Sequence, residues 1–177
     1  MTSSAALKAA NVASLNLADP SLLREQCYID GKWVGTPSKA VDNPANGELV
    51  GHVPFFGAAE TTQAVEAAER AFKTWSVKTA KERANILRKW FDLIVANQED
   101  LAKILTAEQG KPLAEARGEV AIAGAYVEFY SEEARRVFGE TIPSPRPDAR
   151  ILAIKQPIGV AGAITPWNFP SSMVTRK

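Results

Sequence analysis

Scarce residue types narrow what this chain can do. It contains one cysteine, Cys27, so no internal disulfide can form, and this usage is typical of a reducing compartment. The one histidine, His52, has no second histidine or acidic cluster at ligand spacing, so we predict no metal site. A formal net charge of +1 provides no field that attracts nucleic acid or an anionic membrane. No apolar run approaches the roughly 20 residues that a membrane helix requires.

The first residues also lack targeting signals. Residues 1–19 have no basic head followed by an apolar core, so they do not resemble a signal peptide. One lysine and no arginine precede Arg24, which is poor support for a mitochondrial presequence. We therefore predict a loose leader over residues 1–24 and a cytoplasmic location.

What is present is typical of a soluble globular chain, with 46% hydrophobic and 23% charged residues. A length of 177 residues permits one domain and part of another. Asp30-Gly31 separates two β-favouring triplets and predicts a hairpin with a type I′ turn over residues 27–34. A second turn at residues 43–47 precedes a predicted strand over residues 48–53.

From Ala58 to about Phe138 the hydrophobic period becomes helical. Thr79 and Glu82 have the spacing of a capping box, Asn97 is a candidate cap, and Gly110 is a stop signal. Four helices are predicted, with apolar faces at Val65, Ala68, Phe72 and Trp75, at Leu87, Trp90, Phe91, Ile94 and Val95, at Leu101, Ile104 and Leu105, and at Val120, Ala123, Val127, Tyr130 and Ala134. We expect Trp33, Trp75 and Trp90 to be core residues.

After Gly139, which should end the last of these helices, the period returns to that of strands. Residues 141–148 contain three prolines and are predicted to be irregular, whereas residues 150–155 form a predicted strand. The small, apolar run from Val160 to Thr165 is typical of a strand buried on both faces of a parallel sheet. The fold class is therefore α/β, with only the opening strand and helix of such a sheet in this chain.

The heptad Ile164-Thr165-Pro166-Trp167-Asn168-Phe169-Pro170 is the most informative motif. Its two flanking prolines restrict the backbone, so an indole and an amide are presented on a rigid turn, and Pro170 suits the first position of a helix. This helix has a start signal but no closing residue before Lys177.

This heptad resembles the signature turn of the aldehyde dehydrogenase superfamily. Residues 43–48, 108–112 and 155–160 resemble further segments of that family in the same order. Within the superfamily, residues 108–112 and 173–177 are most similar to succinate-semialdehyde dehydrogenase. The resemblance implies the amino-terminal part of an aldehyde dehydrogenase fold, truncated after the first strand of a Rossmann-like sheet.

The domain organisation implied by the resemblance has four parts. They are the leader at 1–24, the hairpin and helices of the cofactor-binding domain at 25–139, an oligomerisation arm at 140–157, and the start of the Rossmann-like sheet at 158–177. The full-length protein is expected to be a homodimer or homotetramer.

The implied reaction is the oxidation of succinate semialdehyde to succinate with NAD or NADP. A cysteine thiolate attacks the aldehyde, hydride passes to nicotinamide, and a glutamate activates water to hydrolyse the thioester. Cys27 is not this nucleophile, because it lies far upstream of the family's catalytic position; the nucleophile and the base are expected outside this chain.

By resemblance, Asn168 donates to the oxyanion, and Ile164, Thr165, Pro166, Trp167 and Asn168 line the dinucleotide site. Arg176 would bind the distal carboxylate of the substrate, and Lys177 matches a proton-relay position. Without the resemblance, Asn168 is a turn former, Trp167 a core residue, and Arg176 and Lys177 are surface cations. Alternative functions are oxidation of glutarate semialdehyde or a neutral aldehyde, or a non-catalytic interaction module.

Overall fold

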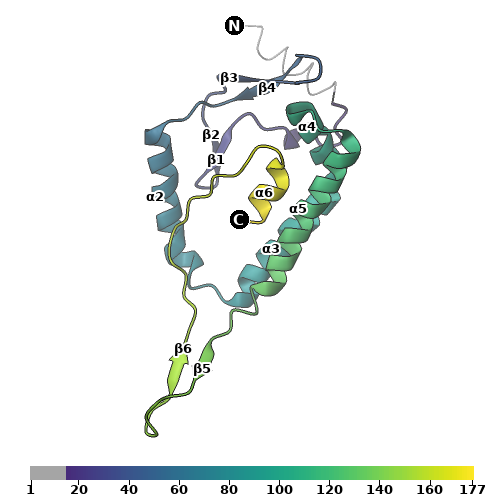
Figure 1. Ribbon diagram of the computed structural model, residues 1–177. Helices are drawn as coiled ribbons and strands as arrows, with labels where there is room; N and C mark the ends of the chain where they lie inside the picture. Colours follow the sequence, from purple (N-terminus) through teal and green to yellow (C-terminus); the bar gives the residue numbers. More distant parts are fainter. Residues whose placement is uncertain (1–14) are drawn as a thin grey trace.

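The computed structural model describes residues 15–177 and has the elongated, open shape shown in Figure 1. Along the chain, two small sheets come first, four consecutive helices follow, and a third small sheet precedes the last helix. The elements are η1 (Pro20–Leu22), β1 (Cys27–Ile29), β2 (Lys32–Val34), β3 (Lys39–Asp42), β4 (Leu49–Val53), α2 (Ala58–Trp75), α3 (Ala80–Ala96), α4 (Gln98–Gln109), α5 (Leu113–Glu133), β5 (Glu140–Ile142), β6 (Ile151–Ala153) and α6 (Pro170–Thr175).

Each sheet is an antiparallel pair of neighbouring strands. The predicted hairpin is confirmed as β1 and β2, with Asp30 and Gly31 at φ 52° and 75°, as a type I′ turn requires. The predicted strand before Val53 is β4, which pairs with β3, a strand that the sequence did not predict. The third pair, β5 and β6, projects away from the helices in Figure 1.

Helix α5 is the centre of the packed region, because α3, α4 and α6 all lie against it. The buried cluster combines residues of three helices, and Leu87, Phe91, Leu101 and Leu113 cover its edges. Its buried members are Ile94, Ala102, Leu105, Ala116, Val120 and Val127. At Gly124 of α5 an added Cβ would lie 3.5 Å from Ile94 and 3.6 Å from Phe91, which is ordinary van der Waals contact, so an alanine would also fit there.

Local signals set two of the helix ends as predicted. The Thr79 hydroxyl accepts from the Glu82 N–H at 3.3 Å, and the Glu82 carboxylate accepts from the Thr79 N–H at 2.8 Å, which confirms the capping box. Gly110 ends α4 at φ 81°. Asn97 occupies the cap position before α4, but its side chain instead donates to the Leu93 carbonyl at the end of α3.

Helix α5 is shorter than predicted, because it ends at Glu133 and not near Phe138. Tyr130 was predicted to face inward, yet it is 45% exposed. Glu140–Ile142 forms β5, so the start of the proline-rich stretch is regular after all, since its backbone pairs with β6.

The tryptophans predicted as core residues are also only partly covered. Trp33, Trp75 and Trp90 are 44%, 40% and 43% exposed. Val65 on the apolar face of α2 is 51% exposed, because α2 stands apart from the other helices in Figure 1.

The predicted strand from Val160 to Thr165 is not a strand in this structure. Residues 154–169 return from β6 to α6 without a ladder partner, and Ile158 and Ile164 are almost fully exposed. A strand is defined by its pairing, and no described segment supplies a neighbour for these residues.

The described part of the predicted leader is held in place. The Ala18 and Asp19 N–H groups donate to the Asp100 carboxylate at 3.1 and 2.8 Å, and Leu23 is buried. Residues 15–24 are therefore not loose, whereas the remainder of that prediction lies outside the described residues.

Candidate functional site

The predicted signature turn is present at the start of α6. Trp167 and Asn168 form the turn, Phe169 is the residue before the helix, and Pro170 takes the first helical position as the sequence predicts. Trp167 is 79% exposed and Asn168 is also exposed. Among the hydrogen bonds of the described residues, Asn168 takes part through its backbone carbonyl and not through its exposed side-chain amide.

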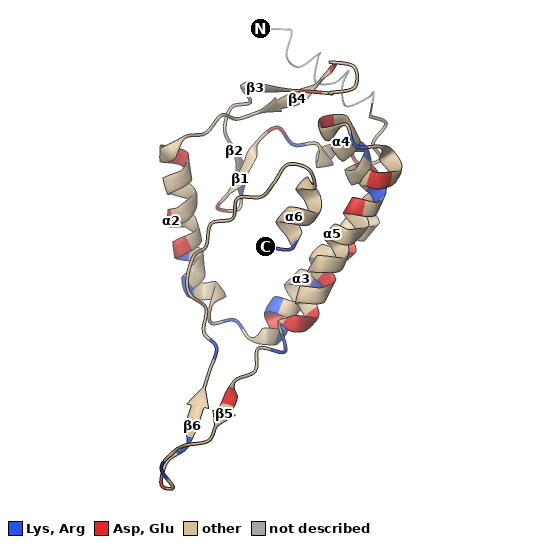
Figure 2. Cartoon of the chain, viewed as in Figure 1, with Lys and Arg blue, Asp and Glu red and all other residues tan. Residues whose placement is uncertain are grey.

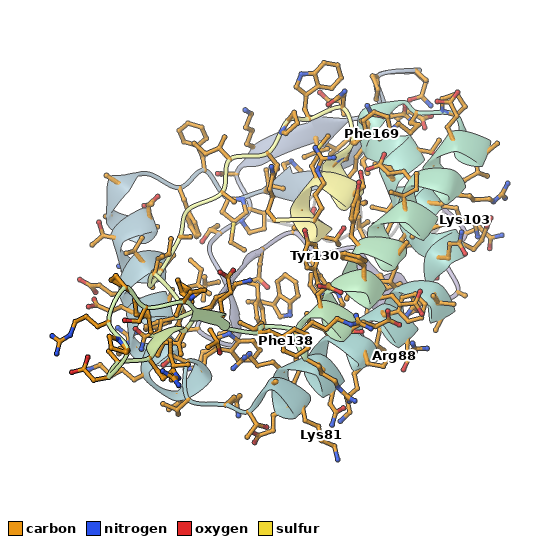
Figure 3. The ribbon with its side chains drawn as sticks, turned by 60° about the horizontal axis from the view of Figure 1, so that its bottom comes forward. Lys81, Arg88, Lys103, Tyr130, Phe138 and Phe169 are labelled. Atoms are coloured by element: carbon orange, nitrogen blue, oxygen red, sulfur yellow. The ribbon has the colours of Figure 1, made fainter. Side chains whose placement is uncertain are left out.

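The turn rests on a buried ion pair between Lys111, in the connection from α4 to α5, and Glu119 of α5. Lys111 donates to a carboxylate oxygen of Glu119, and the two side chains are 8% and 1% exposed. Lys111 Nζ also donates to the Asn168 carbonyl oxygen at 2.9 Å and lies 3.8 Å from the centroid of the Phe169 ring. Figure 3 shows Phe169 where the chain enters α6, beside α5.

Glu119 uses its other oxygen to cap α6. Its Oε1 accepts from the N–H groups of Ser171 at 2.9 Å and Ser172 at 3.3 Å. Phe169 has no side chain able to cap, and Pro170 has no N–H, so this distant carboxylate satisfies the first free donors of the helix.

Two basic residues follow at the end of α6. The Arg176 guanidinium lies 6.0 Å from the Tyr126 ring of α5, and Arg176 is half-buried, so it is more confined than a surface cation. Lys177 is exposed, and among the described residues only its backbone N–H has a recorded hydrogen bond, to Val174.

A cavity of about 350 Å³ opens between α6 and the helices beneath it. Trp90, Leu105, Val120, Pro170 and Val174 provide apolar lining, and Glu108 provides a carboxyl group. Desolvation at this position raises the pKa of Glu108 above its usual value.

Charge is absent from the segment that carries the signature turn. Residues 156–175 contain no charged side chain, whereas both signs are spread over the outer faces of α3 and α5 in Figure 2. The segment therefore presents an exposed indole and unpaired backbone groups rather than charged side chains. No helix in the described range is long and apolar enough to cross a membrane, and no cluster of metal-ligand side chains occurs there.

Comparison with known proteins identifies the class. The profile of the aldehyde dehydrogenase family matches residues 33–177, so this chain belongs to the aldehyde dehydrogenase family, as the resemblance indicated. The match begins within the first hairpin and includes the signature turn and both basic residues of α6.

Similar individual proteins act on different aldehydes, according to their names. Glutarate-semialdehyde dehydrogenase of Pseudomonas aeruginosa and 3-sulfolactaldehyde dehydrogenase of Pseudomonas putida are each 57% identical over 92% of this chain. A crystal structure of succinate-semialdehyde dehydrogenase from Burkholderia pseudomallei has 55% identity and a TM-score of 0.88 over 92% of this chain. The chain spans only 34% of the length of each of these proteins.

The sequence predicted Asn168, Trp167 and Arg176 as site residues, but not the ion pair that contacts the backbone of Asn168 and the start of α6. Lys111 was noted only as part of a motif, and Glu119 was not singled out. One signal was available: Glu119 lies beside Ala116 and Val120 on the buried face of α5, where an unpaired carboxylate is very rare.

Proposed function

We propose that this chain is the amino-terminal third of an NAD- or NADP-dependent aldehyde dehydrogenase that oxidises succinate semialdehyde to succinate. The observation that carries this proposal is the exposed, unpartnered Asn168 amide on a fixed turn, in a chain of this family. The catalytic cysteine and glutamate are proposed to lie in the remaining two thirds. Cys27, half-buried in β1, is not proposed as the nucleophile.

In this proposal, Asn168 donates its amide N–H to the oxygen of the aldehyde as negative charge develops there. A donor already aimed at that position stabilises the transition state more than the ground state. The nicotinamide cofactor, when bound, accepts the hydride. Ile164, Thr165, Pro166 and Trp167 contribute an exposed edge against which the dinucleotide lies.

Arg176 is proposed to select the substrate by pairing with its distal carboxylate. A guanidinium can grip a carboxylate through two parallel hydrogen bonds, and the Tyr126 ring limits where the side chain can go. All three named relatives act on aldehydes that also carry an anionic group, which agrees with a cation at this position. Lys177 is proposed, as a secondary role, to relay protons.

Glutarate semialdehyde is the second candidate substrate, because a relative with 57% identity bears that name. It is one methylene longer than succinate semialdehyde but presents the same terminal carboxylate. The two substrates therefore test the distance between Arg176 and the reacting carbon, and not the charge.

The test is to measure kcat/KM of the complete enzyme for succinate semialdehyde, glutarate semialdehyde and butanal, before and after Arg176→Ala. We expect a loss of roughly 10²-fold or more for the two carboxylated aldehydes and little change for butanal. Equal losses on all three would show that Arg176 is not the selector. Absence of NAD(P)-dependent turnover in the unmodified enzyme would overturn the proposed activity itself.

The β5–β6 pair is proposed to be an oligomerisation arm in a homodimer or homotetramer. It extends beyond the helices, and Leu152 and Ile154 on or next to β6 are 72% and 74% exposed. A strand with an unpaired edge and apolar side chains is suited to pair with another subunit. A cytoplasmic location also remains a proposal, based on the sparing use of cysteine.

A further inference from the structure

The ion pair beneath the signature turn is unusual within this molecule. Among the ion pairs of the described residues, only Lys111–Glu119 has both side chains less than a tenth exposed. The pair that α5 forms with α4, Arg117–Glu99, has side chains that are 46% and 50% exposed. Burying two charges is costly unless further hydrogen bonds compensate them.

The compensating contacts all belong to one short segment. Lys111 reaches the Asn168 carbonyl and the Phe169 ring, and Glu119 reaches the Ser171 and Ser172 N–H groups. The pair therefore holds the chain on both sides of Pro170, and we call this set of contacts the grip. The hydrogen bonds among these contacts join residues 52 to 57 positions apart in the sequence.

The grip acts on the residue whose side chain matters most in the proposed reaction. The carbonyl held by Lys111 belongs to Asn168, and the amide attached to the same residue projects without a partner from the described chain. Fixing the backbone on both sides of Pro170 limits where this amide can point. Within residues 15–177, the Asn168 side chain itself makes no hydrogen bond that could orient it.

We propose that Lys111 and Glu119 are positioning residues that hold the Asn168 amide in the direction needed to meet the oxyanion. The proposal rests on the proposed function, because it assigns a partner to the same amide. Lys111 and Glu119 touch neither substrate nor cofactor in it; they act through the backbone of residues 168–172.

The first test replaces Lys111 with methionine, which has a similar length but no charge, in the complete enzyme. A misplacement of about 1 Å at a reacting group can cost about 10²-fold, so we expect kcat to fall about 10- to 100-fold. KM for the aldehyde should change much less. Lys111→Arg, which keeps a charged donor, should recover part of the lost kcat.

The matched control is Arg117→Met, which removes the exposed ion pair on the same helix. Surface pairs contribute little, so kcat should stay within about twofold of the unmodified enzyme. A similar loss of kcat in both variants would mean that any disturbance of α5 lowers activity, and this would overturn the assignment.

A double-mutant cycle separates positioning from a general structural role. If Lys111 acts through Asn168, Lys111→Met should lower kcat by less than about twofold in an Asn168→Ala background, since the amide it positions is gone. Independent losses that multiply would overturn the proposal.

A second variant covers the case in which Lys111→Met does not fold. Replacing both partners, Lys111→Met with Glu119→Leu, leaves no unpaired buried charge and is expected to fold. It should still show the reduced kcat; a folded double variant with unchanged kcat would contradict the proposal.

Hydrogen exchange provides a readout that does not depend on activity. In the complete enzyme, the Ser171 and Ser172 amides should exchange faster in the Lys111→Met, Glu119→Leu double variant than in the Arg117→Met control. The double variant lacks the carboxylate that accepts hydrogen bonds from these amides. If the unmodified enzyme oxidised no aldehyde while exchange still rose, the proposed function would fail but the grip on the turn would stand. Unchanged exchange of the Ser171 and Ser172 amides would show that the ion pair does not hold the turn, whether or not the enzyme is active.

Discussion

Two regions of this molecule, called here the packed half and the open half, differ in how much of their apolar side-chain surface is buried. The packed half consists of the helices α3, α4, α5 and α6. In it, Ala116, Val120 and Val127 are at most 1% exposed. The open half consists of α2 and residues 154–167. In it, Ile158, Ile164 and Trp167 are 96%, 101% and 79% exposed. The packed half finds its apolar partners within this chain, whereas the open half presents apolar area of the kind that marks an interaction surface.

The signature turn lies where these halves meet. Its two sides differ accordingly: Ser171 and Ser172 are tied to α5, while Ile164 and Trp167 have no such support. The half that fixes the turn is therefore distinct from the half that we propose to contact the cofactor.

The largest consequence of the open half should be association of the chain when it is produced alone. Exposed apolar side chains and unpaired backbone between β6 and α6 favour contact between copies. We expect dilute protein to sediment as a broad distribution of oligomers, with helical circular dichroism retained by the packed half. Ile158→Lys together with Ile164→Lys should narrow the distribution. A single sedimenting species of monomer mass that unfolds cooperatively would contradict the claim that the open half lacks apolar partners within this chain.

Two leucines compare a buried position in the packed half with an exposed position on the projecting β5–β6 pair, which lies outside both halves. Leu105 in the packed half is 5% exposed, and Leu105→Ala should lower the free energy of unfolding by about 2–5 kcal/mol. Leu152 on the projecting β6 is 72% exposed, and Leu152→Ala should change it by no more than about 0.5 kcal/mol. Urea denaturation measures both, using a solubilised background such as the double lysine variant. Equal effects would show that burial does not distinguish these regions.

A smaller effect, on the pH dependence of the free energy of unfolding, is expected where residues 18 and 19 contact the packed half. The Asp19 N–H and then the Ala18 N–H, both donating to Asp100, lower the pKa of this carboxyl. A depressed folded pKa stabilises the protein above the ordinary aspartate value of about 3.9, and this contribution is lost as the pH falls through the folded pKa. The stability difference between the unmodified protein and Asp100→Asn should therefore shrink below about pH 4. A difference that is independent of pH from 6 to 3 would contradict this linkage.

The sequence predicted best where the signal and the structure are close together in the chain. Asp30-Gly31, Thr79 with Glu82, and Gly110 each act over a few residues, and each was found as predicted. The signature turn and Pro170 belong to the same class, because proline restricts its own neighbourhood.

Prediction failed where the outcome depends on distant partners. The Lys111–Glu119 grip joins residues more than 50 positions away, and no local pattern records which segment will cap α6. Trp90 and Tyr130 have helical spacing but lie at the margin of the buried face, so they are about half exposed. Val160–Thr165 has the composition of a buried strand, but composition alone cannot supply the neighbours that a ladder requires.

The role of Asn168 is tested most directly by Asn168→Ala in the complete enzyme, with kcat and KM measured on succinate semialdehyde. Loss of an oxyanion donor should reduce kcat by about 10²- to 10³-fold while KM changes far less, because the donor acts mainly in the transition state. An unchanged kcat would contradict the proposed role and would leave Asn168 as a residue that only forms the turn.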